Sequence, residues 1–366
     1  LTSYVLFDRR PDVAEVDAVE AAQRFLDERD RALERMGVPA EDERWGKGRC
    51  KRALLAHVTG QVRDARTLSR SVTADAERLG WSQVLPEILF IDSVGARMEG
   101  QIDEALALLD RAAELALASG DARGAARCHG QRGWVLLSLR RLDDAEEAFR
   151  TCDRIYGTKG DTWMQGVART GLGAALIERG QLEEAQPVLA DALQTCEVGG
   201  FELGAVDALN HLGLVSQRLG RLDDAERWFV QAASRAEQIE AGTPLREARG
   251  LLSLVQVETG RHTEALPVLE GILAELEANG TWMGRASLLV GLASCDQAQG
   301  RPAAAEQRLA QALEAAERSH EIEPVLVRIA GAVGERAAVA GHEGCAQAAE
   351  RFVAAQLAAA GGPSGR

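Results

Sequence analysis

One short motif recurs along the chain at intervals of forty residues. Most copies begin with glycine and carry an alanine five residues later, as in GQIDEA at 100–105 and GRLDDA at 220–225. Copies begin at residues 60, 100, 140, 180, 220, 260 and 300, and a degraded last copy, GHEGCA, begins one residue late at 341. A repeat of this length indicates small supersecondary units, each of which buries its apolar face against its neighbours.

The motif is typical of the turn between two helices. Glycine directly after a helix adopts the left-handed conformation at low cost. Acidic residues follow where the next helix would start, facing the positive end of its dipole. The third residue after the motif start should cap that helix, and it is Asp103, Asp143, Asp223 or Thr263 in four copies. Each unit is therefore predicted to be a helix–turn–helix, and an aromatic content of only 4% also disfavours a sandwich or barrel.

A second recurring position indicates how the two helices pack. A small residue stands twelve residues before each motif alanine: Ala53, Ser93, Gly133, Gly173, Gly213, Ser253, Ala293 and Gly334. The alanines are Ala65, Ala105, Ala145, Ala185, Ala225, Ala265, Ala305 and Ala346. In six copies a bulky residue follows four positions later: Leu109, Phe149, Leu189, Phe229, Leu269 and Leu309. Small side chains at both places let two helices approach closely without leaving voids.

This order of small residue, turn glycine, alanine and bulky residue resembles the tetratricopeptide repeat, over residues 45–357. The usual unit has about 34 residues, so each unit here is longer, and the usual terminal proline is missing. The forty-residue period, with loops such as 118–126 and 197–206, is most similar to the variant in MalT-like and actinobacterial STAND-type transcription regulators. HEAT repeats have a similar period, but their pattern does not predict the pair of small residue and alanine.

The resemblance implies an all-α, right-handed superhelical solenoid of about eight antiparallel helix hairpins over residues 45–357. Residues 1–44 are expected to form an N-terminal capping helix or a linker from a preceding domain, because apolar residues have helical spacing over 12–36. Residues 358–366 are expected to be a disordered tail. The chain begins with Leu1, so it is interpreted as a piece of a longer protein, although removal of a tag or flexible end would look the same.

Composition and motifs argue against several classes of function. A formal net charge of −14 disfavours direct binding to nucleic acid or to an anionic membrane. Six scattered cysteines without a CxxC pair indicate buried, reduced thiols of a cytoplasmic protein. The six dispersed histidines form no metal-binding pattern, and no phosphate-binding loop or nucleophile elbow is present. We therefore expect no cofactor, no metal and no enzymatic activity.

The resemblance also implies that the first helix of each hairpin lines a concave inner wall. The candidate binding residues on this wall are Phe90, Val94, Arg97, Arg127, Trp134, Asn210, Leu214, Gln217 and Arg218. Such a mixture suits a peptide, a helix of another domain or a small-molecule effector. Packing against the neighbouring hairpin is the alternative for each of them, and Trp134 is the best candidate for a ligand anchor. The lysine–asparagine clamp of chaperone-binding relatives is absent.

A sensor or autoinhibitory region of a larger cytoplasmic regulator, acting on transcription, is the function that the resemblance implies. Its partner would be a protein, a peptide or another domain of the same polypeptide, which would favour one conformation over another. A free-standing scaffold for a protein partner is the main alternative. An enzyme that uses the solenoid as a recognition arm would need catalytic residues outside this chain.

Overall fold

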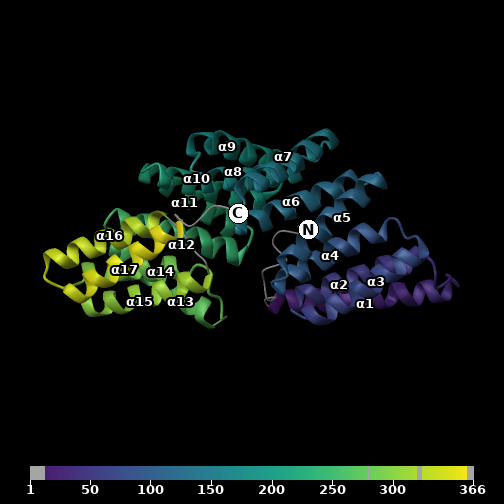
Figure 1. Ribbon diagram of the computed structural model, residues 1–366, viewed down its shortest axis with the longest axis horizontal. Helices are drawn as coiled ribbons and strands as arrows, with labels where there is room; N and C mark the ends of the chain where they lie inside the picture. Colours follow the sequence, from purple (N-terminus) through teal and green to yellow (C-terminus); the bar gives the residue numbers. More distant parts are fainter. Residues whose placement is uncertain (1–12, 279, 320–323, 361–366) are drawn as a thin grey trace. The chain divides into compact units, whose positions relative to one another are not determined.

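The computed structural model describes residues 13–278, 280–319 and 324–360, and all regular secondary structure there is α-helical (Figure 1). The helices are α1 (Val13–Arg35), α2 (Glu43–Val58), α3 (Val62–Leu79), α4 (Val84–Met98), α5 (Ile102–Ala118), α6 (Ala122–Ser138), α7 (Leu142–Lys159), α8 (Thr162–Glu178), α9 (Leu182–Val198), α10 (Glu202–Arg218), α11 (Leu222–Gln238), α12 (Gly242–Glu258), α13 (His262–Ala278), α14 (Arg285–Ala298), α15 (Pro302–Ser319), α16 (Pro324–Val339) and α17 (Glu343–Ala360). From α2 onward they pair as hairpins, each even-numbered first helix packing on the second helix that follows. The predicted all-α hairpin fold is confirmed.

The chain divides into two compact units at the boundary between Asp161 and Thr162. The first unit contains α1 and three hairpins, and the second contains five hairpins. Within each unit, the first helices of adjacent hairpins also contact one another. In the second unit α10 contacts α16 as well, although two hairpins separate them along the chain.

The motif glycines take the left-handed conformation, as predicted. Gly60 has a φ of 77° and Gly180 a φ of 76°, and Arg140 adopts the same conformation without glycine, at 56°. Residues in the turns between hairpins do likewise, as Gly80 and Gly160 show with φ of 70° and 66°. A left-handed residue therefore ends nearly every helix, and the two kinds of turn share one geometry.

The predicted side-chain caps are wrong in the hairpins where they can be compared. Helices α5, α7 and α11 start earlier than expected, and their N-cap residues Gln101, Arg141 and Arg221 form no side-chain capping bond. Asp103 and Asp143 are instead the second residues of their helices. They still face the positive end of the helix dipole, and this explains why acidic residues occur at these positions without a capping role.

The predicted contact between small and bulky residues forms the core of each hairpin. A Cβ atom added to Gly133 would lie 2.8 Å from the Phe149 ring, and one added to Gly213 would lie 2.4 Å from the Phe229 ring. Both rings are fully buried. The eight motif alanines are buried as well. Glycine is required at these two positions because the facing aromatic ring occupies the space of a side chain.

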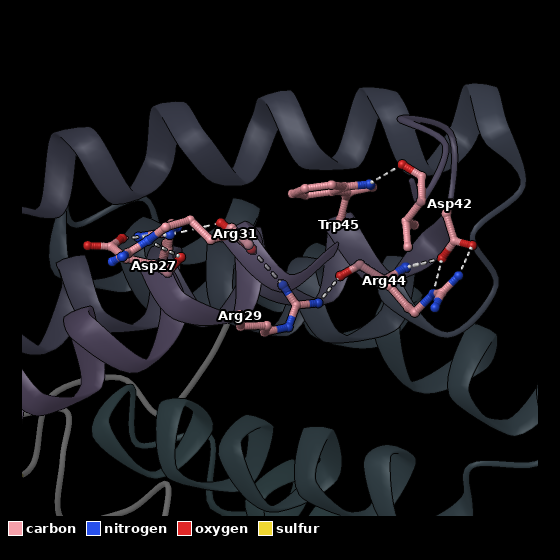
Figure 2. A network of polar contacts seen from close by, with 9 residues as sticks. Asp27, Arg29, Arg31, Asp42, Arg44 and Trp45 are labelled. Atoms are coloured by element: carbon pink, nitrogen blue, oxygen red, sulfur yellow. Dashed lines mark hydrogen bonds and ion pairs between the residues drawn. The ribbon is translucent and has the colours of Figure 1, made fainter. Parts of the chain in front are cut away.

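Helix α1 buries Leu26 and Leu33 and also contacts α2 through charged groups (Figure 2). Arg52 on α2 pairs with Asp27 at 2.9 Å and Asp30 at 2.8 Å on α1. Arg29 donates to Asp30 at 2.8 Å and to the main-chain carbonyl of Arg44, a contact visible in Figure 2. At the other end of the chain α17 continues to Ala360, and the remainder of the predicted tail, 361–366, lies outside the described residues.

Candidate binding surface on the first helices

One side of each first helix contacts the first helices of the neighbouring hairpins. This side carries the residues at positions −6, −3, −2, +1, +4 and +5, counted from the small residue of that helix. The geometry of an α-helix places these positions together. Contacts between hairpins confirm this assignment. The Arg127 guanidinium on α6 lies 4.2 Å from the ring centroid of Phe90 on α4, and Arg218 on α10 pairs with Glu178 on α8 at 2.8 Å. We call this surface, taken in each unit by itself, the first-helix face.

In the first unit, the predicted candidates divide between the core and the surface. Phe90 and Val94 are buried in the apolar core, and Arg127 covers the Phe90 ring. Trp134 is half-buried and packs edge-on against Phe149, with ring centroids 5.3 Å apart. Phe90 and Val94 thus serve hairpin packing, and Trp134 contributes to the same core while keeping part of its surface open.

Arg97 and Arg127 retain unsatisfied donors on this face. Both are half-buried, and neither has a carboxylate oxygen within 4.0 Å among the described residues. The Nε atom of each is buried and donates no hydrogen bond. A half-buried cation without a counter-charge is unfavourable in the free protein, so both guanidinium groups are available to an anionic or carbonyl-bearing ligand.

Elsewhere in this unit, a buried arginine is fully surrounded by acceptors. Arg66 lies 3.0 Å from Asp92, 2.8 Å from Glu104 and 2.6 Å from the amide oxygen of Gln101. Next to it, burial and the positive charge of Arg66 lower the pKa of His57 to about 4, so the imidazole is neutral at pH 7. This cluster joins α3 to α4 and α5 and is structural, because its charges are already matched.

In the second unit, polar side chains link successive first helices. Gln217 on α10 is buried and donates from Nε2 to Glu258 on α12 at 2.7 Å. Arg218 donates to Glu178 and, at 2.9 Å, to the carbonyl of Ile177 on α8. Leu214 packs partly against the core around Phe229. These predicted candidates therefore hold α8, α10 and α12 together.

A further arginine, which the sequence did not single out, joins this network from α16. Arg328 donates to Glu258 at 2.9 Å and 3.0 Å, and to the main-chain carbonyl of Gln217 at 3.4 Å. These bonds account for the contact between α10 and α16. Arg328 stands six residues before Gly334, the same register as Arg127 before Gly133. This position relative to the small residue could have identified Arg328 from the sequence, but the last copy of the motif is degraded and hides it.

Asp207, His211 and Glu247 form a cluster of titratable groups on the same face, also missed from the sequence. The Nδ1 atom of His211 lies 2.9 Å from the carbonyl oxygen and 3.4 Å from the carboxylate of Asp207. Burial lowers the pKa of His211, but the Asp207 charge and hydrogen bonds more than offset it and raise the pKa to about 9. Burial, then the Asp207 charge, raises the pKa of Glu247.

The side chain of Glu247 reaches solvent, and burial by the protein around it is the main cause of its raised pKa. Beside the cluster, Asn210 is buried and its Oδ1 accepts no hydrogen bond.

Comparison with known proteins gives the repeat class. Residues 164–238 and 244–318, both in the second unit, match the family model described as tetratricopeptide repeat. Over these residues the chain is similar to the tetratricopeptide repeat. A search of curated proteins finds no significant match.

Solved structures of similar fold cover nearly the whole chain at low sequence identity. Aspartyl phosphate phosphatase F from Bacillus subtilis has a TM-score of 0.65 at 12% identity, covering 100% of this chain and 97% of that one. The Rap conjugation gene regulator of the plasmid pLS20, in complex with the Phr* peptide, has a TM-score of 0.60 at 15% identity, covering 93% and 94%. A STAND protein with a tetratricopeptide repeat sensor from Pyrococcus horikoshii has a TM-score of 0.56 at 12% identity, covering 93% and 53%. At these identities the likeness shows the fold alone.

Three further expectations concern the cysteines, membrane-spanning helices and enzymatic activity. All six cysteines are free and buried, as predicted. None of the described helices is both long and apolar enough to cross a membrane. The expected lack of enzymatic activity stays a prediction, since one of the similar structures is a phosphatase.

Proposed function

We propose that this chain is a regulatory module in which the first-helix face of each unit binds peptide and passes its occupancy to another domain or protein. One observation carries the proposal: charged groups on the first-helix face of each unit lack a carboxylate, lysine or arginine partner, while Arg218 on the same kind of face is paired. They are Arg97 and Arg127 in the first unit, and Glu247 and Asp207, which pairs only with His211, in the second. A ligand that supplies the opposite charges would be recognised there.

The structures of similar fold support this proposal by analogy. One of them is a gene regulator in complex with a peptide, and in another the repeat domain is named as a sensor. By this analogy the larger protein would be a cytoplasmic regulator, with transcription as its output. A free-standing scaffold is the second candidate, favoured by Phe25 and Met36, whose side chains are 67% and 69% exposed around α1.

Selection from a random heptapeptide library displayed on phage tests peptide binding. The immobilised chain should enrich a recurring sequence, and the synthetic peptide should then bind with an affinity measurable by fluorescence anisotropy. Arg97→Ala or Arg127→Ala should weaken binding at least about tenfold, which corresponds to about 1.4 kcal/mol. Arg111→Ala is the matched control, because Arg111 lies on α5 and pairs with Glu77 away from this face.

Trp134→Ala separates anchoring from packing. A loss of affinity of about 1 kcal/mol or more, measured under conditions where the variant is fully folded, would assign the exposed part of Trp134 to the ligand. Unchanged affinity with lower stability would return it to the core. The proposal as a whole fails if no sequence is enriched, or if the variants of the first-helix face bind the selected peptide as tightly as the Arg111→Ala control.

A further inference from the structure

We infer that the second unit carries a subsite for a cationic side chain of the bound peptide, with arginine preferred, formed by Asp207, His211, Glu247 and the amide of Asn210. The inference rests on the proposed function, because the subsite is part of the first-helix face. It adds the chemical class of the ligand group and the residues that would recognise it.

The position of the two carboxylates is the first observation. Asp207 on α10 and Glu247 on α12 occupy the same register, six residues before the small residue of their helices. They are near enough for the charge of Asp207 to raise the pKa of Glu247. His211 lies one turn after Asp207 and bonds to it. Two carboxylates and one imidazolium leave a net negative charge on this part of the first-helix face.

The neighbouring arginines do not neutralise this charge. Arg246 on α12 pairs with Glu275 on α13 at 3.5 Å, and Arg249 pairs with Glu237 on α11 at 3.2 Å. Within the described part of the chain, neither Asp207 nor Glu247 has a lysine or arginine nitrogen within 4.0 Å. Burial is the main cause of the raised pKa of Glu247 and the charge of Asp207 adds to it, whereas His211 and Arg246 lower it; a bound cation would favour the charged carboxylate further.

Asn210 supplies an independent observation. It stands between Asp207 and His211 in the sequence and about one turn from Asp207 on the same side of α10. Its side chain is only 1% exposed, and its Oδ1 accepts no hydrogen bond. A buried amide oxygen without a donor is rare in folded proteins. Because Asn210 and Asp207 both belong to the first-helix face of α10, the unused acceptor of Asn210 would take an N–H donor of a ligand bound there.

The combination favours arginine over lysine. A guanidinium presents five N–H donors in a plane, so it can satisfy two carboxylates and an amide oxygen together, whereas an ammonium group has three donors. The same face already holds one guanidinium, because Glu258 binds Arg328 at 2.9 Å. The Asp207–Glu247 pair offers the same chemistry without an arginine of the chain to fill it.

Peptide selection on three proteins tests the inference. The wild-type chain, the double variant Asp207→Asn/Glu247→Gln and the control Glu183→Gln/Asp223→Asn are each panned with the random heptapeptide library. Glu183 and Asp223 are exposed acids at the starts of second helices, so the control removes the same charge elsewhere. Wild type and control should enrich arginine at one fixed position, and the subsite variant should not.

A charge-neutral analogue then measures the contact directly. Replacing the selected arginine by citrulline should weaken binding to wild type at least tenfold, but less than twofold to the subsite variant. Circular dichroism and the midpoint of urea unfolding verify that each variant is folded. If the double variant does not fold, the single variant Glu247→Gln replaces it in the same comparison. Selected peptides without a basic preference, or an equal citrulline penalty on both proteins, would overturn the subsite while leaving peptide binding intact. Failure to select any peptide would overturn the proposed function itself.

Discussion

Replacing Gly213 with alanine tests the packing rule that defines the hairpins. The new Cβ would lie 2.4 Å from Cε1 and 2.6 Å from Cζ of Phe229, where carbon atoms normally approach to about 3.5–4.0 Å. The ring is fully buried, so α10 and α11 must separate. Overpacking costs about 1–3 kcal/mol, and the helix propensity of alanine returns up to about 1 kcal/mol. The free energy of unfolding should therefore fall by about 1–2 kcal/mol in urea denaturation followed by circular dichroism.

Two further variants make this experiment decisive. Gly250→Ala on α12 is the control, since its Cβ would meet only ordinary contacts, the nearest 3.7 Å away at Ile272, and it should stabilise by about 0.5–1 kcal/mol. Adding Phe229→Leu to Gly213→Ala pairs a residue larger than glycine with leucine. The hairpin of α12 and α13 has the same combination, Ser253 and Leu269. The double-mutant cycle should show a coupling of at least about 1 kcal/mol. Equal stabilities of Gly213→Ala and Gly250→Ala, or additive effects in the cycle, would refute the packing argument.

Three other predictions concern buried charges and thiols. Arg66→Met should lower the free energy of unfolding by about 3–5 kcal/mol, because Asp92 stays buried without its cation; a loss no larger than that of the exposed control Arg70→Met would count against this. His211 has a pKa raised from 6.5 to about 9, so its stabilisation is complete below pH 6.5 and is lost as pH rises through 9. Stability should fall by about 3 kcal/mol over that range, and this part of the pH profile should vanish in His211→Gln. All six thiols are buried, and burial raises the pKa of Cys50 and Cys128 to about 12, so iodoacetamide at pH 8 should label less than one thiol per native chain but all six in urea.

The local structure of this chain follows from its repeats. Glycine, alanine and the bulky residue recur in phase, so the turns at Gly60 and Gly180 and the contact of Gly213 with Phe229 could be predicted without coordinates. The caps could not, because whether Asp103 precedes or follows the helix start depends on one residue of the turn. A second helix that begins immediately after Gln101 makes the aspartate part of its first turn.

The binding surface was less accessible to sequence reasoning. Helical register identifies which side of α4 carries Phe90 and Val94, but the rotation between hairpins decides whether the next hairpin covers them. The same rotation brings Arg328 to Glu258 across 70 residues. Asp207 and Glu247 were passed over because acids are common on helices. Only the partners of the surrounding arginines show that these two are left without a lysine or arginine.

The bridge from Arg328 to α10 changes how the second unit should fold. A stack with contacts only between neighbours can open one hairpin at a time, and its stability is the sum of local terms. The hydrogen bond from Arg328 to Gln217 closes a loop of 111 residues, so the hairpins between them cannot fray independently while it holds. The second unit should accordingly unfold in one cooperative transition. Its last hairpin should stabilise the hairpins between α10 and α16, so its loss should lower the stability of the whole unit.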